Sequence, residues 1–264
     1  MKSFRYYFED FESRMKTGRK LELELADAMS KELSEIEKSN EFQIILPDLK
    51  YQTNWLINYI KSNAPINIQN KINLSESDPE KLLNSIESVD KFLYYKILGE
   101  FGAKFGDVVV GSNIKKNDNF ETAKLFVDTK VGDKVSLRSL ARFADNLSDK
   151  QIPYYLIKTG KTFVLIKYHR SIIANLVKYF NDSIIIANNL SKKATIDSLK
   201  NVSYHKSIPA DIINNSKDFY KADSDDKGSG EIMVKLSKLK EISNENKEFS
   251  NLKEVSKFLV SKIL

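Results

Sequence analysis

Asp128 and Lys130 close the apolar run Leu125–Val127, with a single threonine between them. Side chains two residues apart on a β-strand point to the same face, so an extended chain here sets this carboxylate beside this ammonium. Such a pair is either an ion pair at the rim of a sheet, which contributes little to stability, or the centre of a metal-dependent active site. The surrounding sequence has to distinguish these two interpretations.

The acid-x-Lys pattern carries little information by itself, because the chain is rich in lysine and contains the pattern four times. Two of the other pairs lie in polar segments that we expect to be exposed, and the third follows a proline with no acid-bearing strand before it. Only Asp128/Lys130 ends a clean apolar strand and also follows a second predicted strand that begins with an acid, Asp107. The four pairs are Asp48/Lys50, Asp128/Lys130, Asp225/Lys227 and Glu245/Lys247.

Two carboxylates from neighbouring strands, Asp107 and Asp128, could hold Mg²⁺, a hard cation that prefers oxygen ligands. A bound metal polarises a phosphoryl oxygen and acidifies a water for attack on a phosphodiester. Lys130 reaches the same face as Asp128 and could orient that water or stabilise the developing charge. The backbone carbonyl of Thr129 would be a further oxygen ligand, and Mn²⁺ is a possible substitute for Mg²⁺.

Glu22 is a fourth candidate, from a helix predicted at residues 18–38. Apolar residues recur on one face of this helix, and Glu22 lies within that apolar stripe, whereas Glu24 lies well off it. A carboxylate on the core-facing side of a helix needs a partner or a purpose. We therefore expect Glu22 to support the metal site.

The composition narrows the chemistry further. The chain has 264 residues with 41% hydrophobic and 30% charged, which is typical of a globular protein with a sizeable core. The absence of cysteine excludes disulfides, thiolate metal sites and a cysteine nucleophile, and two histidines argue against a histidine-rich zinc site. The net charge of +6 is compatible with an anionic partner such as nucleic acid, although a lysine-rich, AT-rich coding bias would produce it too.

Neither a membrane span nor a signal peptide is evident, since no run of about 18 apolar residues occurs and acids are spread through the first residues. We therefore expect a cytoplasmic protein with no membrane partner.

Hydrophobic periodicity and turn residues predict one α/β domain around a central mixed β-sheet flanked by helices, with no linker dividing it. Gly99, Gly102 and Gly106 are predicted to break a helix before the first strand. The predicted helices are 18–38, 51–62, 79–100, 134–147, 171–180 and 247–263. The predicted strands are 107–111, 123–130, 152–158 and 162–168, with shorter ones at 183–187 and 231–239, and residues 190–227 are predicted to be irregular.

The segment GDVVV followed by KLFVDTK resembles the core of the PD-(D/E)XK nuclease superfamily, which includes most Type II restriction endonucleases. In that family an acid opens one strand, an acid-x-Lys ends the next, and a helix and two more core strands follow. GRKLE also resembles the first-helix pattern of the family, in which a glycine, here Gly18, precedes an inward glutamate by four residues. The resemblance covers roughly 18–170, and it departs from the family at Gly106, which stands in place of proline, and in a somewhat long loop between the acids.

The resemblance implies a restriction-endonuclease-like core at 18–170 within a single nuclease domain, 1–264, with 171–264 contributing DNA recognition or dimerisation. It implies a Mg²⁺-dependent endonuclease that cuts double-stranded DNA at a specific site as a homodimer. Two alternatives stay open: a structure-specific or single-strand nuclease of repair, recombination or viral origin, and a non-catalytic DNA-binding protein with this fold.

Several basic residues outside this core motif are candidates for DNA contacts. Arg138 and Arg142 lie together opposite the apolar face of the predicted helix 134–147, where we expect them to be exposed. Lys158 and Lys161 flank a predicted two-residue turn, and His169 ends a predicted strand. Each of these residues also fits an ordinary solvated surface.

Overall fold

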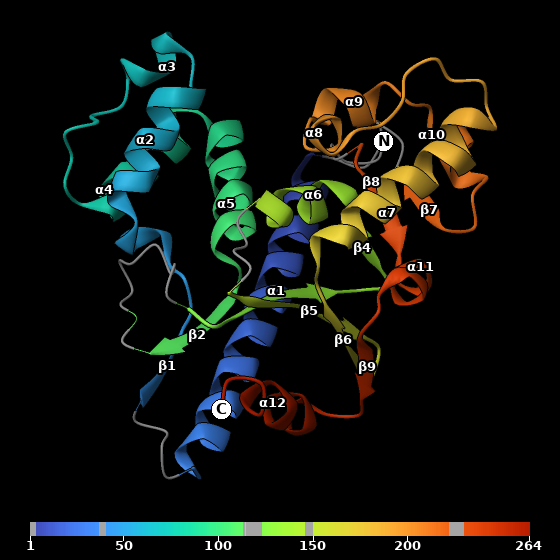
Figure 1. The fold of residues 1–264 in the computed structure, drawn as a ribbon. Helices are drawn as coiled ribbons and strands as arrows, with labels where there is room; N and C mark the ends of the chain where they lie inside the picture. Colours follow the sequence, from blue (N-terminus) through green and yellow to red (C-terminus); the bar gives the residue numbers. More distant parts are fainter. Residues whose placement is uncertain (1–3, 37–40, 113, 115–122, 146–149, 222–229) are drawn as a thin grey trace.

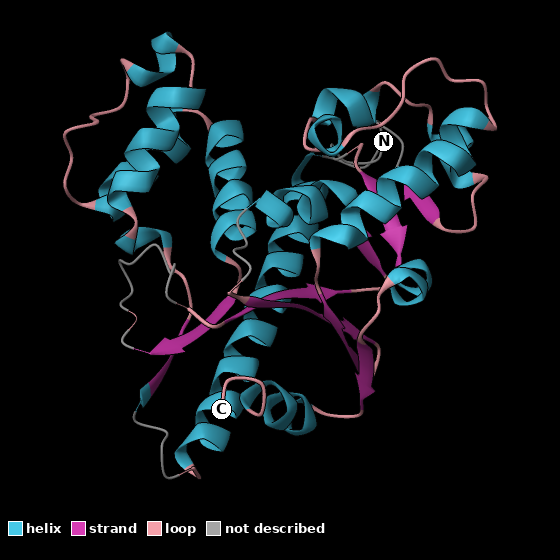
Figure 2. Cartoon of the chain, viewed as in Figure 1, coloured by secondary structure: helices cyan, strands magenta, loops and turns pink. Residues whose placement is uncertain are grey.

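A mixed six-stranded sheet lies at the centre of the molecule (Figures 1 and 2). The computed structural model describes residues 4–36, 41–112, 114, 123–145, 150–221 and 230–264. The strand order is β1-β2-β3-β5-β6-β9, and β3 and β5 are parallel whereas all other neighbours are antiparallel. The predicted α/β class with a mixed sheet is therefore confirmed. The strands are β1 (Phe42–Ile45), β2 (Val108–Ser112), β3 (Leu125–Val131), β5 (Ile152–Thr159), β6 (Thr162–Lys167) and β9 (Asn246–Phe249).

Two helices cover one face of this sheet. The two helices are α1 (Phe4–Ser34) and α12 (Leu252–Val260). The apolar stripe of α1, from Leu21 to Leu33, forms one hydrophobic cluster with the apolar residues of α12 and with the side chains of β2 and β3 that point to this face. Both faces of the central strands are buried, which explains why their sequences are continuous apolar runs rather than alternating ones.

Helices also cover the opposite face, where the larger hydrophobic core lies. One group precedes the sheet core in sequence: η2 (Leu49–Tyr51), α2 (Thr53–Asn63), α3 (Ile66–Gln69), α4 (Pro79–Val89) and α5 (Lys91–Phe105). A second group consists of α6 (Leu137–Asp145), α7 (Arg170–Phe180), the π-helical turn η3 (Asn181–Ile186), α8 (Ile196–Leu199), α9 (Val202–Lys206), α10 (Ala210–Asn214) and α11 (Leu236–Ile242). With the second group lies a three-stranded sheet in the order β4 (Lys134–Ser136), β8 (Ile232–Lys235), β7 (Phe219–Lys221).

The boundary between α4 and α5 shows local capping chemistry that divides a segment predicted as one helix. Asp78 accepts hydrogen bonds from the backbone N–H groups of Glu80 and Lys81, and Pro79 stands at the first helical position. Asp90 then caps α5 by accepting from the N–H of Leu93. The predicted helix 79–100 is therefore two helices.

Other predicted elements also differ from the structure. Gly99 and Gly102 lie inside α5, residues 134–136 form β4 rather than the start of a helix, and 246–249 form β9 rather than the start of the last helix. The segment predicted as a strand at 183–187 continues α7 as a π-helical turn, because Ile184 and Ile185 are buried in the larger core. The predicted loop between β2 and β3 falls almost entirely outside the described residues. Within the part of the chain that is described, no helix is long and apolar enough to cross a membrane.

Gly106 joins α5 to the sheet in a backbone conformation that only glycine adopts readily. It has φ +67° and ψ −172°, and its N–H donates to the carbonyl of Gly102 to end the helix. Proline, whose φ is held near −65°, cannot take this conformation. A proline at position 106 would therefore not fit this chain path into Asp107.

Replacing Gly106 by alanine should destabilise the protein through backbone strain. We expect Gly106→Ala to lower the free energy of unfolding by about 1–3 kcal/mol, measured by urea unfolding. A Cβ here would meet its nearest atom, the Val127 carbonyl oxygen, at 3.5 Å, so the loss would come from φ and not from crowding.

The matched control is Gly99→Ala in the same helix, where a Cβ would meet nothing within 4 Å. This change should leave stability unchanged or raise it by up to about 1 kcal/mol. Equal effects of the two substitutions would contradict the assigned conformation of Gly106.

Candidate active site

The pairing of β2 with β3 brings Asp107 and Asp128 together. The two strands are antiparallel with Val108 opposite Val127, so the residues one step further along, Asp107 and Asp128, face each other across the pair. The N–H of Asp107 donates to the carbonyl of Val127 at 3.0 Å, which extends the ladder to the acid. Two carboxylates 21 positions apart in sequence thus become direct neighbours at one end of the sheet.

Each of these carboxylates makes hydrogen bonds through one oxygen. Asp107 Oδ2 accepts from the backbone N–H of Thr129 at 2.6 Å and from its hydroxyl at 2.9 Å. Asp128 Oδ1 pairs with Lys130 Nζ at 2.6 Å. Asp128 also lies close enough to Asp107 for the two carboxyl groups to interact directly, which contributes to the raised pKa of Asp128.

Burial dominates the electrostatics of this cluster. The Asp128 side chain is 7% exposed, and burial raises the pKa of its carboxyl group to about 8, opposed by the Lys130 ammonium and reinforced by Asp107. Burial alone would lower the pKa of Lys130, but the carboxylates of Asp128, Asp107 and Glu22 outweigh it and raise that pKa. Three acids surround one lysine, so the cluster as a whole favours an additional proton or a cation.

Glu22 reaches this cluster from α1. Its side chain is 16% exposed, and Arg19 Nη1 contacts its Oε2 at 2.6 Å. Burial and then the charge of Asp107 raise the pKa of Glu22, while Arg19 and Lys130 lower it. The structure therefore places Glu22 within electrostatic reach of both Asp107 and Lys130, held there by the buried leucines on either side of it along the stripe.

Tyr155 adds a buried hydroxyl to the site. It lies opposite Asp128 in the parallel pairing of β3 with β5 and is 2% exposed. Burial and the adjacent Asp128 charge raise its pKa well above the usual value, yet the hydroxyl has no partner at hydrogen-bonding geometry among the described residues. The sequence gives no sign that Tyr155 lies beside Asp128, because this depends on the parallel register of β3 and β5. An unsatisfied buried hydroxyl beside the carboxylates indicates a site that is completed by another polar group.

Two carboxylates with few other protein ligands suit Mg²⁺ better than they suit a metal ion whose ligands all come from protein side chains. Among the described residues, no three acidic or histidine side chains converge closely enough to hold an ion. Mg²⁺ commonly keeps several waters and takes only one or two carboxylates from a protein. Asp107 and Asp128 could supply those two, and their roles, like that of the Thr129 carbonyl, stay predictions.

The predicted DNA-contacting residues separate into different regions. Lys158 lies opposite Val131 in the register of β3 with β5, and Lys161 is exposed in the turn between β5 and β6, so both lie at the end of the sheet that carries Lys130. His169 follows the other end of β6, where its Nδ1 accepts from the N–H of Ser171 and caps α7. His169 is thus far along the sheet from the two lysines.

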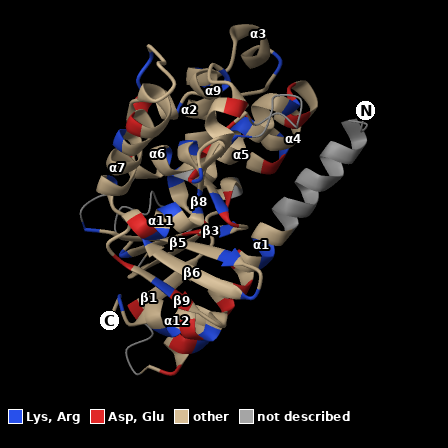
Figure 3. Ribbon diagram, turned by 90° about the vertical axis from the view of Figure 1, so that its right-hand side faces the viewer, with Lys and Arg blue, Asp and Glu red and all other residues tan. Residues whose placement is uncertain are grey.

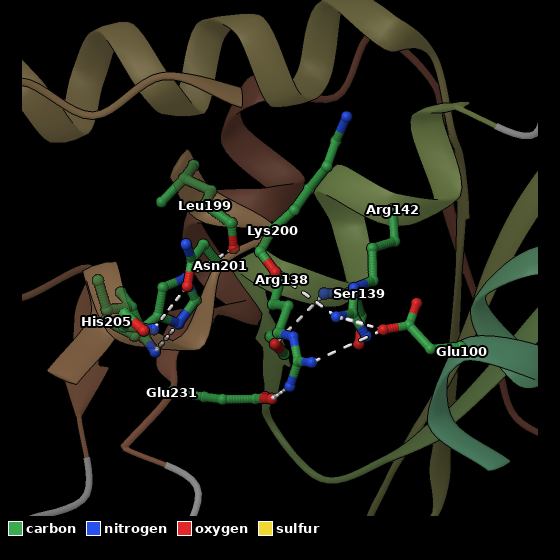
Figure 4. Close-up of polar contacts among 12 residues, drawn as sticks. Glu100, Arg138, Ser139, Arg142, Leu199, Lys200, Asn201, His205 and Glu231 are labelled. Atoms are coloured by element: carbon green, nitrogen blue, oxygen red, sulfur yellow. Dashed lines mark hydrogen bonds and ion pairs between the residues drawn. The ribbon is translucent and has the colours of Figure 1, made fainter. Parts of the chain in front are cut away.

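The expectation that Arg138 and Arg142 are exposed is wrong. Their side chains are 17% and 16% exposed and form an ion-pair network (Figure 4). Arg142 Nη2 contacts Glu100 Oε1 of α5 at 2.5 Å, and Arg138 Nη1 contacts Glu231 Oε1, just before β8, at 3.1 Å. The helix face opposite the apolar one is covered by α5 and β8, which are distant in sequence, so these arginines join three parts of the fold.

No family model, curated protein or solved structure matches this chain. The site is therefore interpreted from its own geometry.

Metal-free protein should lose stability as the pH rises, because of Asp128. Its raised pKa lets the folded state keep a proton near neutral pH that the unfolded chain releases near pH ~4. The folded state binds more protons than the unfolded state in this range, so stability falls between about pH 4 and about pH 8. Asp128→Asn should flatten this dependence, measured as urea midpoints at several pH values in EDTA.

The control is Asp27→Asn at an exposed carboxylate of α1, which should keep the wild-type pH profile. Identical profiles for wild type and Asp128→Asn would show that Asp128 is not the titrating group.

Breaking the ion-pair network should cost stability. Arg142→Ala leaves Glu100 without its 2.5 Å partner, so we expect a loss of about 2–4 kcal/mol, somewhat less than for a fully buried pair. Lys31→Ala removes an equally close pair with Asp27 whose side chains are 73% and 63% exposed and should cost at most about 0.5 kcal/mol. Chemical unfolding compares the two, and similar losses would contradict the structural role of Arg142.

Proposed function

We propose that this protein is a Mg²⁺-dependent endonuclease that hydrolyses phosphodiester bonds of double-stranded DNA. The observation that carries the proposal is the meeting of Asp107 with Asp128 at the end of two paired strands, with Lys130 in contact with Asp128. The resemblance of these strands to the PD-(D/E)XK superfamily supports the same activity. The excess of buried carboxylates over ammonium groups supports a cation at this position.

In the proposed mechanism Asp107 and Asp128 would hold Mg²⁺, or Mn²⁺ in its place, through their carboxylate groups. The metal supplies polarisation of a phosphoryl oxygen and a water of lowered pKa. Lys130, held by Asp128, orients the attacking water and offsets negative charge that develops on the phosphate. The charge of Glu22 adds to those of Asp128 and Asp107, which contribute more, in raising the pKa of the Lys130 ammonium.

The contacts around Asp107 are equally important to this mechanism. Thr129 donates twice to Asp107 Oδ2, which fixes the carboxylate so that its other oxygen is presented to the site. Tyr155, buried opposite Asp128, would limit the access of water to that side of the carboxylate. Such restraint lowers the reorganisation needed during the reaction.

The more specific proposal is a Type II restriction endonuclease that acts as a homodimer on a symmetric site in the cytoplasm. Two copies of one active site, related by a two-fold axis, would cut both strands of a symmetric duplex. Residues 171–264 add α7 to α11 and most of the three-stranded sheet beyond the catalytic strands. These elements are available for target recognition or dimer formation.

Cleavage of supercoiled plasmid with Mg²⁺ tests the activity. We expect the wild type to convert the plasmid to linear fragments, and Asp128→Ala and Lys130→Ala each to slow cleavage by at least ~100-fold. Lys247→Ala is the matched control, because Lys247 lies on the edge strand β9 and belongs to another acid-x-Lys pair, Glu245/Lys247. This variant should retain wild-type activity.

Discrete fragments whose ends share one sequence would support a restriction enzyme, whereas a smear would indicate a nuclease without a specific site. A wild type that cuts neither duplex nor single-stranded DNA with Mg²⁺ or Mn²⁺ would overturn the proposed activity.

A further inference from the structure

The three-stranded sheet has one buried face and one open face. Its buried residues pack into the larger core, and alternate positions point away from it. The inward residues are Val135, Phe219, Ile232 and Val234. The outward residues that retain exposure are Lys134, Tyr220, Met233 and Lys235, and these four define the open face.

Two lysines lie directly opposite each other on this face. Lys134 pairs with Lys235 in the antiparallel register of β4 and β8, and the N–H of Leu236 donates to the carbonyl of Asp133 next to them. This bond makes Lys134/Lys235 a pair of the non-hydrogen-bonded kind, in which side chains are closest. Like charges directly opposite on a sheet are destabilising. Among the described residues, no ion pair includes either lysine.

An aromatic ring completes the open face. Lys134 Nζ lies 3.9 Å from the ring centroid of Tyr220 on β7. This contact draws the Lys134 side chain across β8, so that both lysines and the ring lie on one surface. Along the ribbon, acidic and basic residues are interspersed (Figure 3).

The open face is close to the candidate active site along the chain. β4 follows β3 after only Gly132 and Asp133, so Lys134 is four residues beyond Lys130. The chain between them spans at most about 14 Å. Each strand of a DNA duplex carries one charge per about 3.4 Å of helix axis, so a strand bound at Asp128 must bring further phosphates within reach of this face.

We propose that the open face binds the phosphate backbone of duplex DNA next to the bond that is cut. Lys134 and Lys235 would each contact a phosphate, which offsets their mutual repulsion, and Tyr220 holds Lys134 in position. This proposal rests on the proposed nuclease function. It adds a second surface, beside the active site, that contacts the DNA. Contacts of this kind set the position of the duplex and are independent of base sequence.

Salt-dependent binding measures the number of phosphate contacts directly. A fluorescently labelled duplex of mixed sequence is titrated with full-length protein, Ca²⁺ replacing Mg²⁺, at a series of salt concentrations. The slope of log K against log salt should fall by about 2 in magnitude for the Lys134→Gln/Lys235→Gln double variant. The loss in affinity should be the same for an unrelated duplex sequence.

The matched control is Lys253→Gln/Lys257→Gln, which removes the same charge from exposed positions on α12 across the six-stranded sheet. This control should keep the wild-type slope. Lys235→Gln alone should keep or raise the thermal midpoint, because it relieves the repulsion and leaves the contact between Lys134 and Tyr220.

The outcomes separate the two proposals. If the wild type binds and cuts DNA but the double variant keeps the wild-type slope, the open face is not a phosphate-binding surface and the nuclease function stands. If the wild type binds no duplex, both proposals fail. If Lys235→Gln lowers the thermal midpoint, the lysines are structural and the surface proposal is overturned.

Discussion

The antiparallel register of β2 and β3 is the constraint on which the rest of the site depends. It sets Asp107 opposite Asp128, and a shift by one residue would turn one acid to the other face of the sheet. The register is held by apolar residues buried on both faces, since Val108 and Val127 pack under α1 while Val109 and Phe126 face the larger core. Hydrophobic burial thus supplies the energy that keeps two like charges together.

The contacts around Asp107 and Asp128 stabilise carboxylates that are unfavourable to bury. Lys130 compensates Asp128, the Thr129 N–H and hydroxyl satisfy Asp107, and Arg19 restrains Glu22. The compensation is incomplete, because burial still raises the pKa of Asp128. A residual preference for positive charge is what a cation site requires. The ion pairs of Arg138 and Arg142 serve a different purpose, which is to fix α5 and the strand β8 to α6.

The features nearest to the motif were predictable from sequence because they depend on local periodicity. The helical stripe of α1, the apolar strand ending at Asp128/Lys130 and the hairpin of β5 and β6 follow from spacing alone. Arg138 and Arg142 were predicted as exposed because sequence does not show which distant elements cover a helix face. Ile184 and Ile185 are β-branched residues typical of strands, yet burial against the larger core keeps them helical. Tyr155 is a neighbour of Asp128 only through a parallel register that no sequence pattern specifies.

Binding of Mn²⁺, followed by electron paramagnetic resonance, tests most directly whether Asp107 and Asp128 form one metal site. The wild type should bind one ion per chain in this site. Asp107→Asn and Asp128→Asn should each weaken binding by at least ~10-fold, as expected when one of only two carboxylate ligands is lost. The control Asp27→Asn, on the exposed surface of α1, should bind as the wild type does. Wild-type affinity in either site variant would contradict a shared metal site at the junction of β2 and β3.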